Sequence, residues 1–303
     1  MSAARYVAGL DGGGTKTALL CMDAAGAVVG ENTFGPLNVN GTDWADVRRV
    51  LGEVAAFLTA LPGECAGLTV SAAGISNPQA KAIIEESLRN AGFSAPIEIR
   101  GDQESALRGA VGQVGAVLIA GTGSICYGRN AAGRTTRCGG WGHLLDDEGS
   151  GYAIGRDILR AVLLALDGRG PQTMLTGLVA DRLGSAQPAD IIRFVYAPGR
   201  NKREIAALAE LLGPALAESD AAAQRIAISA ADALATLCAP VLDGLDLQAG
   251  ELALVGGVLT HHEAIRDRLR SQLTDKYPKL SIIQPRHSAA WGAADFARET
   301  FLA

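Results

Sequence analysis

Short apolar runs separated by turn residues open the chain, and longer amphipathic stretches follow them. Short apolar runs bounded by Gly, Asp or Asn are typical of strands, and apolar residues at a 3.6-residue period are typical of helices. Over positions 1–113 this pattern predicts strands at 5–12, 16–22, 27–34, 68–73 and 97–100, and helices at 43–61, 78–91 and 103–111. The chain therefore opens with three consecutive strands rather than with a strand–helix–strand unit.

The opening pattern occurs a second time further along the chain. Thr15 and Thr122 occupy the same place in the two copies, and the turn at 23–26 (DAAG) returns at the same offset at 130–133 (NAAG). Two copies in one register predict two domains of related fold, 1–113 and 114–303. Chance similarity between two hairpins rich in Gly and Ala is the alternative.

The rest of the chain is more helical. The pattern predicts strands at 115–122, 124–129, 134–138 and 280–285, and helices at 155–166, 171–183, 189–195, 202–212, 219–242 and 288–301. The segment 251–260 reads as a strand that runs into a Gly-Gly turn, and a helix follows it to Leu273. Strands that alternate with helices in this way are typical of an α/β fold.

Composition narrows the class of protein. The chain has 303 residues, 48% of them hydrophobic, which suits two globular domains. A net charge of −5 argues against nucleic acid as the main partner. No uninterrupted apolar stretch approaches the length of roughly 20 residues that a bilayer requires, so we expect no membrane span. Five widely spaced cysteines without metal-ligand spacing predict reduced thiols in a cytoplasmic protein. The commonest assembly, a homodimer, is the expectation for the oligomeric state.

The turn after the first strand reads LDGGGTKT (10–17). Consecutive glycines allow backbone N–H groups to approach a phosphate closely, and Thr15 adds a hydroxyl donor. Asp11, at the end of the strand, is placed to hold a hydrated Mg²⁺. Lys16 either adds positive charge or points to solvent. A plain hairpin turn is the alternative, although three glycines followed by Thr exceed what such a turn needs.

Three further turns follow apolar strands, where an open α/β sheet binds its ligand. The AGTGS turn (120–124) is the counterpart of the first glycine turn, and a plain hairpin turn explains it as well. Asp102, between a strand and a helix, suits a base that accepts a hydroxyl proton, or equally a helix N-cap with Ser105 at N3. The VGG turn (255–257) suits a nucleoside or phosphate, or a close contact between a helix and a strand.

The segment CGGWGHLLDDEGSGYAIG (138–155) combines six glycines with an aromatic residue and three successive acids. Trp141, between Gly140 and Gly142, suits stacking on a sugar face, and Asp147 or Glu148 suits binding of sugar hydroxyls. An acidic surface loop before a helix is the alternative.

Together these motifs resemble the N-acetylglucosamine kinase and BadF/BadG/BcrA/BcrD ATPase family of the actin-like ATPase and sugar-kinase superfamily, and most of all its bacterial glucosamine and N-acetylglucosamine kinases. The resemblance extends from GLDGGGTKT to RHSAAWGAA (286–294). It implies two actin-like (ribonuclease H-like) α/β domains, with ATP and a small-molecule sugar in the cleft between them. It also implies Mg·ATP-dependent phosphorylation of the sugar 6-hydroxyl.

The resemblance assigns roles to individual residues. Asp102 matches the catalytic base, and Asp11 would hold Mg²⁺ through water. The nucleotide-binding residues would be Gly13, Gly14, Thr15, Lys16, Gly121, Thr122 and Gly123 for the phosphates, and Gly256, Gly257 and Ala215 for adenosine. The sugar-binding residues would be Asn38, Asp102, Gly140, Trp141, Gly142 and Asp147.

One departure from the family pattern concerns the sugar. Many members carry Gly before the sugar-binding Asp, where this chain has Asp146. An additional carboxylate there would favour a cationic amino sugar over its neutral N-acetyl form.

Two other functions compete with a kinase. The first is an ATPase activator of a reductase or dehydratase, which would bridge an iron–sulfur cluster across a dimer; only Cys138 lies near a suggestive glycine turn. The second is a sugar sensor that binds sugar without ATP turnover. No helix-turn-helix segment precedes the first strand, which argues against a DNA-binding repressor.

Overall fold

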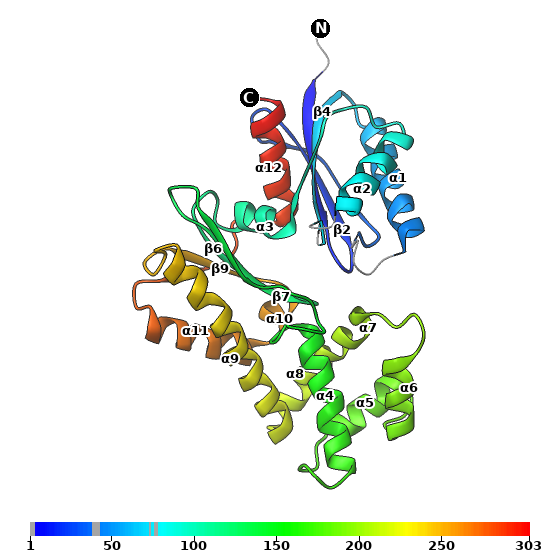
Figure 1. Cartoon of the computed structure of the whole chain (residues 1–303), viewed down its shortest axis with the longest axis vertical. Coiled ribbons are helices and arrows are strands. Elements are labelled where there is room, and N and C mark those ends of the chain that lie inside the picture. The colour runs from blue at the N-terminus through cyan, green and yellow to red at the C-terminus, as the bar shows by residue number, and fades with distance from the viewer. Residues whose placement is uncertain (1–3, 38–42, 73, 76–77) are drawn as a thin grey trace. The chain divides into compact units, whose positions relative to one another are not determined.

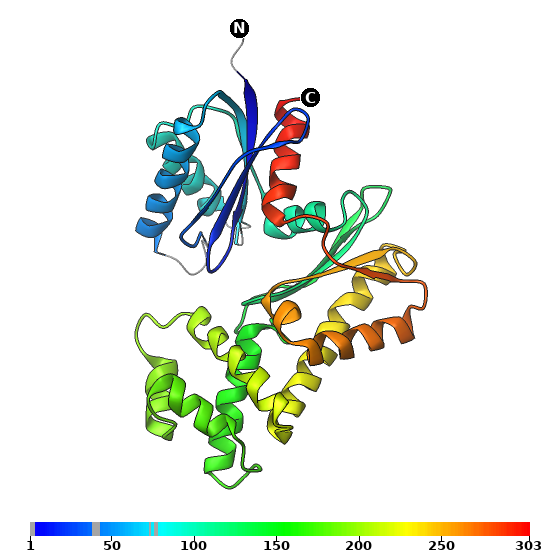
Figure 2. The same cartoon turned by 180° about the vertical axis from the view of Figure 1, so that it is seen from behind.

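The computed structural model describes residues 4–37, 43–72, 74–75 and 78–303. They form two compact units. Unit 1 comprises residues 1–113 and 285–303, and unit 2 comprises residues 114–284. Unit 1 is blue to cyan with a red C-terminal helix in Figure 1, and unit 2 is green to orange (Figures 1 and 2).

The described part of unit 1 holds a five-stranded mixed sheet of order β3-β2-β1-β4-β5. Its strands are β1 (Arg5–Gly12), β2 (Thr17–Asp23), β3 (Val28–Phe34), β4 (Glu64–Ala72) and β5 (Ile97–Gly101), and its helices are α1 (Trp44–Ala60), α2 (Pro78–Asn90), α3 (Asp102–Ala110) and α12 (Ala289–Phe301). Strands β1, β2 and β3 are antiparallel, whereas β1, β4 and β5 are parallel. The carboxyl ends of these parallel strands therefore meet at one edge of the sheet.

Alternation along β1 divides the core of unit 1 between the two faces of its sheet. Tyr6, Ala8 and Leu10 point to the face that α1 and α2 cover. Val7 points to the opposite face and packs with Ala294 of α12. Figures 1 and 2 show α12 on one side of the sheet, next to α3, with α1 and α2 on the other side.

The described part of unit 2 repeats this topology, with the order β10-β9-β6-β7-β8. Its strands are β6 (Gly115–Ala120), β7 (Ser124–Arg129), β8 (Thr135–Gly139), β9 (Glu251–Val255) and β10 (Ser281–Ile283). Its helices are α4 (Gly151–Leu166), α5 (Leu175–Leu183), α6 (Pro188–Tyr196), α7 (Lys202–Ala206), the 3₁₀ helix η1 (Ala207–Leu211), α8 (Leu212–Ala217), α9 (Ala221–Gly244), α10 (Gly257–His261) and α11 (Glu263–Lys276).

The duplicated turns confirm that the two sheets share one plan. The N–H of Asp23 donates to the carbonyl of Ala27, and at the same place in the second copy the N–H of Asn130 donates to the carbonyl of Arg134, both at 3.0 Å. The glycine near the end of each turn, Gly26 or Gly133, is left-handed, with φ of 84° and 79°. The repeat seen in the sequence is therefore a repeat of structure.

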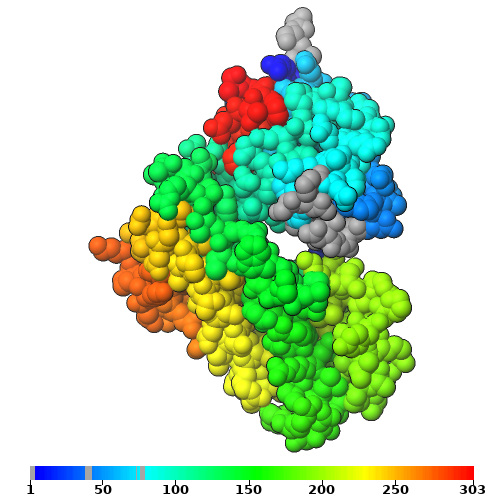
Figure 3. Space-filling model, viewed as in Figure 1, coloured from blue at the N-terminus to red at the C-terminus, as the bar shows by residue number. Residues whose placement is uncertain are grey.

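Helix α9 contributes much of the core of unit 2. Among the described residues it is the one helix that is long and apolar enough to cross a membrane. This is weak evidence for a membrane span, because core helices of other proteins meet the same criteria. About half of its apolar window is buried, and it packs against β6, β7 and β8 and against α4 and α11. Figure 3 shows α9 (yellow) and α4 (green) side by side on one face of unit 2.

The C-terminal helix belongs to unit 1, whereas the sequence places it in a second domain of residues 114–303. Helix α12 lies directly on β1 at Gly9, where a side chain would overlap the backbone of Ala293 and Ala294. The small residues on both elements allow this contact, which no local pattern in the sequence reveals.

A buried ion pair joins α12 to α3. The Arg108 guanidinium donates to Asp295 at 2.6 Å, and the two side chains are only 10% and 6% exposed. Arg298, one turn further along α12, donates to the other oxygen of Asp295 at 2.7 Å. Burial alone would raise the pKa of Asp295, but the hydrogen bonds from Arg298 and Arg108 outweigh it and lower the pKa.

The contact at Gly9 predicts a stability difference between two glycine variants. Gly9→Ala should lower the free energy of unfolding by about 1–3 kcal/mol, because the added methyl group displaces α12. Gly52→Ala, inside α1 where nothing lies within 4 Å of the new methyl group, should raise it by about 0.5–1 kcal/mol. Urea unfolding of both variants gives the comparison, and equal effects would contradict the assigned contact.

The buried ion pair predicts a pH-dependent loss of stability. Asp295→Asn should cost about 3 kcal/mol or more at pH 7, because it leaves Arg108 buried without its main partner. Since the folded pKa of Asp295 is lowered, its contribution is complete above the unfolded pKa of about 3.9 and is lost as the pH falls through the folded pKa. The difference between wild type and variant in urea should therefore shrink below about pH 4.

The control for this prediction is Asp46→Asn, which breaks an exposed ion pair with Arg49 on α1. Asp46 and Arg49 are three residues apart, as are Asp295 and Arg298. Solvent screens that pair, so little change is expected at either pH. A loss as large as that of Asp295→Asn would show that burial is not the cause.

Candidate active site

Two carboxylates lie at the carboxyl edge of the sheet in unit 1. Gly12 of β1 pairs with Ala72 of β4, which in turn pairs with Gly101 of β5. Asp11 precedes the first of these residues and Asp102 follows the last, so the sheet brings both acids to the same edge. Burial and the charge of Asp102 raise the pKa of Asp11 to about 7, against the opposing charge of Lys16. Two acids so close favour a bound cation or a shared proton.

Asp102 is the first residue of α3, and Gly101 is its N-cap. The N–H of Gly101 donates to the Glu104 carboxylate at 3.2 Å. The alternative of Asp102 as the N-cap with Ser105 at N3 is therefore wrong, because Glu104 occupies N3. The Ser105 hydroxyl instead forms a buried 2.5 Å hydrogen bond with Ser71 of β4. This bond fixes the start of α3, and with it Asp102, to the sheet.

The glycine turn of unit 1 closes between β1 and β2. The N–H of Gly13 donates to the carbonyl of Lys16 at 3.1 Å, and the N–H of Leu37 donates to the carbonyl of Gly13 at 3.2 Å. Thr15 and Lys16 are exposed at the tip, where a phosphate would reach them. Asn38, the expected sugar-binding residue that follows Leu37, lies outside the described residues.

The carboxylates of unit 1 suit a hydrated magnesium ion better than a metal enclosed by protein. Among the residues that the structure describes, no group of three or more His, Cys, Asp or Glu side chains is arranged to hold a metal. Mg²⁺ bound with a nucleotide usually keeps several waters and uses one or two carboxylates. Asp11 would supply such a carboxylate.

The second glycine turn is tied to the start of α4. The N–H of Gly151 donates to the carbonyl of Gly121 at 2.8 Å, and the N–H of Tyr152 donates to that of Thr122 at 3.4 Å. The turn itself closes through a 2.9 Å bond from the N–H of Gly121 to the carbonyl of Gly123. Helix α4 therefore begins directly beside Thr122, at Gly151 rather than at the predicted position 155.

Asp147 reaches back to this turn. Its carboxylate accepts the N–H of Ser124 at 3.3 Å and lies against Gly123, and its side chain is buried. The Ser124 hydroxyl donates to the carbonyl of Glu148 at 2.8 Å. Burial raises the pKa of Asp147, against the Ser124 hydrogen bond and the charge of Lys202. Its backbone is left-handed (φ 63°), a conformation with a cost that marks many functional sites.

Trp141 is presented to solvent by a left-handed backbone. Gly140 and Gly142 on either side of it have φ of 73° and 93°. The N–H of Trp141 donates to Asp146 at 3.4 Å, while the Arg137 guanidinium lies 4.0 Å from the centre of the indole ring. The indole is 62% exposed. One oxygen of Asp146 is therefore occupied by this turn, which reduces its capacity to select a cationic sugar.

The VGG turn meets the second glycine turn, but Ala215 does not. Gly256 (φ 101°) lies directly on the backbone of Ala120, and Gly257 begins α10. Ala215 is fully buried in the core of unit 2, so its side chain has no surface to offer adenine.

Sequence reasoning missed two basic residues of this region. Burial and then the charge of Lys202, the first residue of α7, lower the pKa of His143. At Asp147 the charge of Lys202 only opposes burial, which raises the pKa. Arg137 lies in β8, and only its nearness to Trp141 in the sequence hints at its position.

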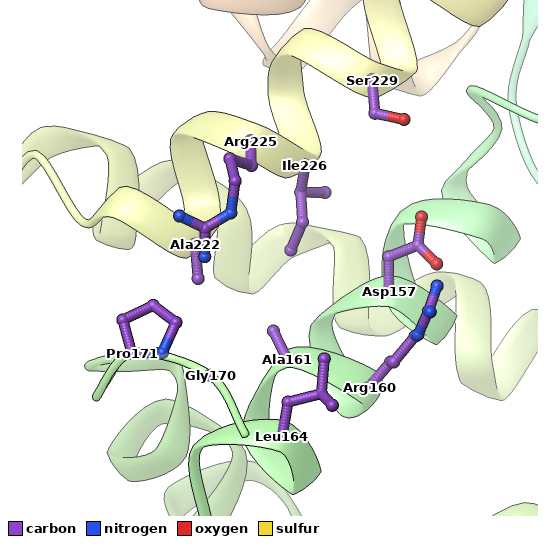
Figure 4. Close-up of a pocket in the computed structure, with 10 residues that line it drawn as sticks. All are labelled: Asp157, Arg160, Ala161, Leu164, Gly170, Pro171, Ala222, Arg225, Ile226 and Ser229. Atoms are coloured by element: carbon purple, nitrogen blue, oxygen red, sulfur yellow. The ribbon is translucent and has the colours of Figure 1, made fainter. Parts of the chain in front are cut away.

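A separate pocket of about 200 Å³ opens between α4, α9 and the loop at 170–171 (Figure 4). Ala161, Leu164 and Ile226 form apolar walls, and Arg160 and Arg225 extend from the two helices toward it. None of the residues assigned to nucleotide or sugar lines this pocket.

The position of Asp147 predicts a difference among three variants. Asp147→Ala should lower the free energy of unfolding by about 1–3 kcal/mol, because it leaves the buried N–H of Ser124 without an acceptor. Asp147→Asn should cost less, since Asn tolerates the left-handed backbone and keeps an acceptor. Asp246→Ala is the control, because Asp246 has the same backbone (φ 57°) but is exposed. If both alanine variants lose the same free energy of unfolding in urea, the left-handed backbone alone explains the loss and the hydrogen bond to Ser124 does not.

The comparisons with known proteins cover nearly the whole chain. An N-acetylmuramic acid/N-acetylglucosamine kinase of Clostridium acetobutylicum is 37% identical over 97% of this chain and 98% of its own length. An N-acetyl-D-glucosamine kinase of Dictyostelium discoideum is 32% identical over 94% of this chain and 95% of its own length. The crystal structure of a candidate N-acetylglucosamine kinase from Chromobacterium violaceum is 25% identical, with a TM-score of 0.79 over 97% of this chain and 99% of its own.

The likeness in structure confirms the expected fold class of two related actin-like ATPase domains. The family model matches residues 8–297, which includes both glycine turns and the whole acidic segment. The chain therefore belongs to the BadF/BadG/BcrA/BcrD ATPase family.

Proposed function

We propose that the chain is an ATP-dependent kinase that phosphorylates the 6-hydroxyl of N-acetylglucosamine or glucosamine. The observation that carries this proposal is the pair of carboxylates, Asp11 and Asp102, beside a glycine turn at one sheet edge. Phosphoryl transfer to a hydroxyl needs a base, charge neutralisation and backbone N–H donors, and this edge offers all three. Relatives named as kinases of N-acetylated amino sugars match nearly the whole chain, which supports the same substrate class.

In the proposed reaction Asp102 accepts the proton of the 6-hydroxyl as that oxygen attacks the γ-phosphorus. The bond between the γ-phosphorus and the β-bridging oxygen breaks, and ADP leaves. Ser71 and Ser105 position Asp102 by fixing the start of α3. Mg²⁺ bound with ATP neutralises charge on the phosphates, and Asp11 would hold this ion through water.

The remaining residues bind and orient the two substrates. Gly14, Thr15 and Lys16 of one turn, and Thr122 and Gly123 of the other, would donate to phosphate oxygens. Gly13 and Gly121, whose N–H groups close the two turns, would shape them for the phosphates. Gly256 and Gly257 present bare backbone to the nucleoside. The sugar-binding set comprises Asn38, Gly140, Trp141, Gly142 and Asp147. In that set Asp147 also holds the second glycine turn, so sugar and phosphate positions would be coupled.

Two expectations about the protein in the cell complete the proposal. The five cysteines are all free thiols, which suits a reducing compartment, and we place the activity in the cytoplasm. The oligomer is proposed to be a homodimer on the general frequency of that assembly. The partner is a small sugar, and neither nucleic acid nor a membrane has a role in the proposed reaction.

The proposal predicts that sugar stimulates ADP release and that this stimulation depends on Asp102. ADP release with Mg·ATP is measured without sugar and with glucose, glucosamine, N-acetylglucosamine and N-acetylmannosamine. An amino sugar should stimulate release strongly, and Asp102→Asn should lower kcat about 10²–10⁴-fold, because the hydroxyl proton loses its acceptor.

Asp190→Asn is the control, since Asp190 lies in the first turn of α6 and outside the proposed site. It should leave the rate unchanged, and circular dichroism should show that both variants fold. Near-normal turnover by a folded Asp102→Asn protein would remove Asp102 as the base. Slow release that no sugar stimulates would favour an ATPase activator or a sugar sensor instead.

A further inference from the structure

The Arg137 guanidinium covers one face of the indole of Trp141. Its central carbon lies 4.0 Å from the ring centre, within the range of a cation–π contact. Arg137 lies in β8 opposite Tyr127 of β7, and the chain then turns back through left-handed glycines to Trp141. Because Asp146 also holds the backbone N–H of Trp141, the ring is fixed from two sides.

Arg137 keeps its hydrogen-bonding capacity for a ligand. Its side chain is exposed, and within the described parts of the chain it forms no ion pair or hydrogen bond. Arg156 of α4 differs, because Glu148 and Asp157 occupy its guanidinium. Arg134, in the same hairpin, donates to the carbonyl of Gly244. A guanidinium on an aromatic ring leaves its N–H edge open, and that edge matches a carboxylate in a two-bond arrangement.

We propose that Arg137 is a specificity-determining residue that binds the carboxylate of an acidic amino sugar, beside the sugar face that Trp141 contacts. This inference rests on the proposed function, and it adds one class of substrate to it. The class comprises N-acetylated hexosamines that carry a carboxylate on an ether substituent, of which N-acetylmuramic acid is the test compound. Arg137 and Trp141 then act together, the ring on the sugar and the guanidinium on the acid.

The charges near the ring agree with this selection. Asp146 is the acid that would favour a cationic sugar, but one of its oxygens accepts the N–H of Trp141. The positive charge of Arg137 has no such partner in the described chain. A neutral sugar leaves this guanidinium in water, whereas a carboxylate-bearing sugar pairs with it.

The test compares kcat/KM for N-acetylmuramic acid and N-acetylglucosamine in wild type, Arg137→Gln, Arg137→Lys and Arg134→Gln. Arg137→Gln should lower the ratio of the two efficiencies (acidic over neutral sugar) at least about 10-fold, mainly through KM for the acid. Arg137→Lys should give an intermediate ratio, because it keeps the charge but loses the two-bond geometry. Arg134→Gln removes a charge from the same hairpin and should leave the ratio unchanged.

A measurement on the wild type alone provides a second test. Raising the salt concentration should weaken binding of the acidic sugar more than that of the neutral one, because ions screen the pairing. If the wild type phosphorylates N-acetylglucosamine but Arg137→Gln leaves the ratio unaltered, the inference is overturned and the proposed function stands. A wild type that phosphorylates only the neutral sugar also overturns it. If neither sugar is phosphorylated, the proposed function fails and the inference fails with it.

Discussion

A buried carboxylate, that of Asp147, holds together the part of unit 2 on which its chemistry depends. It accepts the N–H of Ser124 at the end of the second glycine turn. A few residues further on, where α4 begins, the N–H groups of Gly151 and Tyr152 donate to carbonyls of the same turn. Because Asp147 is left-handed and buried, it stays in place only while the surrounding segment fixes it. The second glycine turn, the acidic segment and α4 are therefore one cooperative piece, and displacement of any one of them would move Thr122.

Unit 1 depends on a different constraint, the absence of side chains where α12 meets the sheet. Gly9 allows the helix backbone to approach β1, and Gly109 and Gly292 allow similar contacts among α3, α12 and the residues before it. The ion pair between Arg108 and Asp295 then fixes the angle of α12 against α3. Since α3 begins with Asp102, the C-terminal helix helps to position the proposed base although it is distant in sequence.

The sequence was informative wherever a signal is local. The repeated opening pattern predicts the common topology, because a turn such as DAAG or NAAG dictates its own hydrogen bonds. Helix starts were less predictable. Helix α5 begins at Leu175 rather than 171, since Asp220 binds the Thr173 hydroxyl and the Met174 N–H and holds that segment outside the helix. The packing of α12 on unit 1 and the position of Arg137 on Trp141 depend on contacts across the fold, which no local pattern contains.

The two copies diverge in a way that fits their proposed chemistry. Gly12 pairs with Thr17 and Ala120 pairs with Ser124, so the turn in unit 1 is one residue longer and Asp11 corresponds to Ile119. Thr15 and Thr122 both supply a hydroxyl, whereas the carboxylate exists in unit 1 only. A hydroxyl can donate a hydrogen bond to a phosphate oxygen, whereas a carboxylate beside that phosphate repels it unless a cation is bound. The carboxylate of Asp11 therefore has no counterpart at the same strand position of the second copy, where Asp147 reaches the turn from the acidic segment instead.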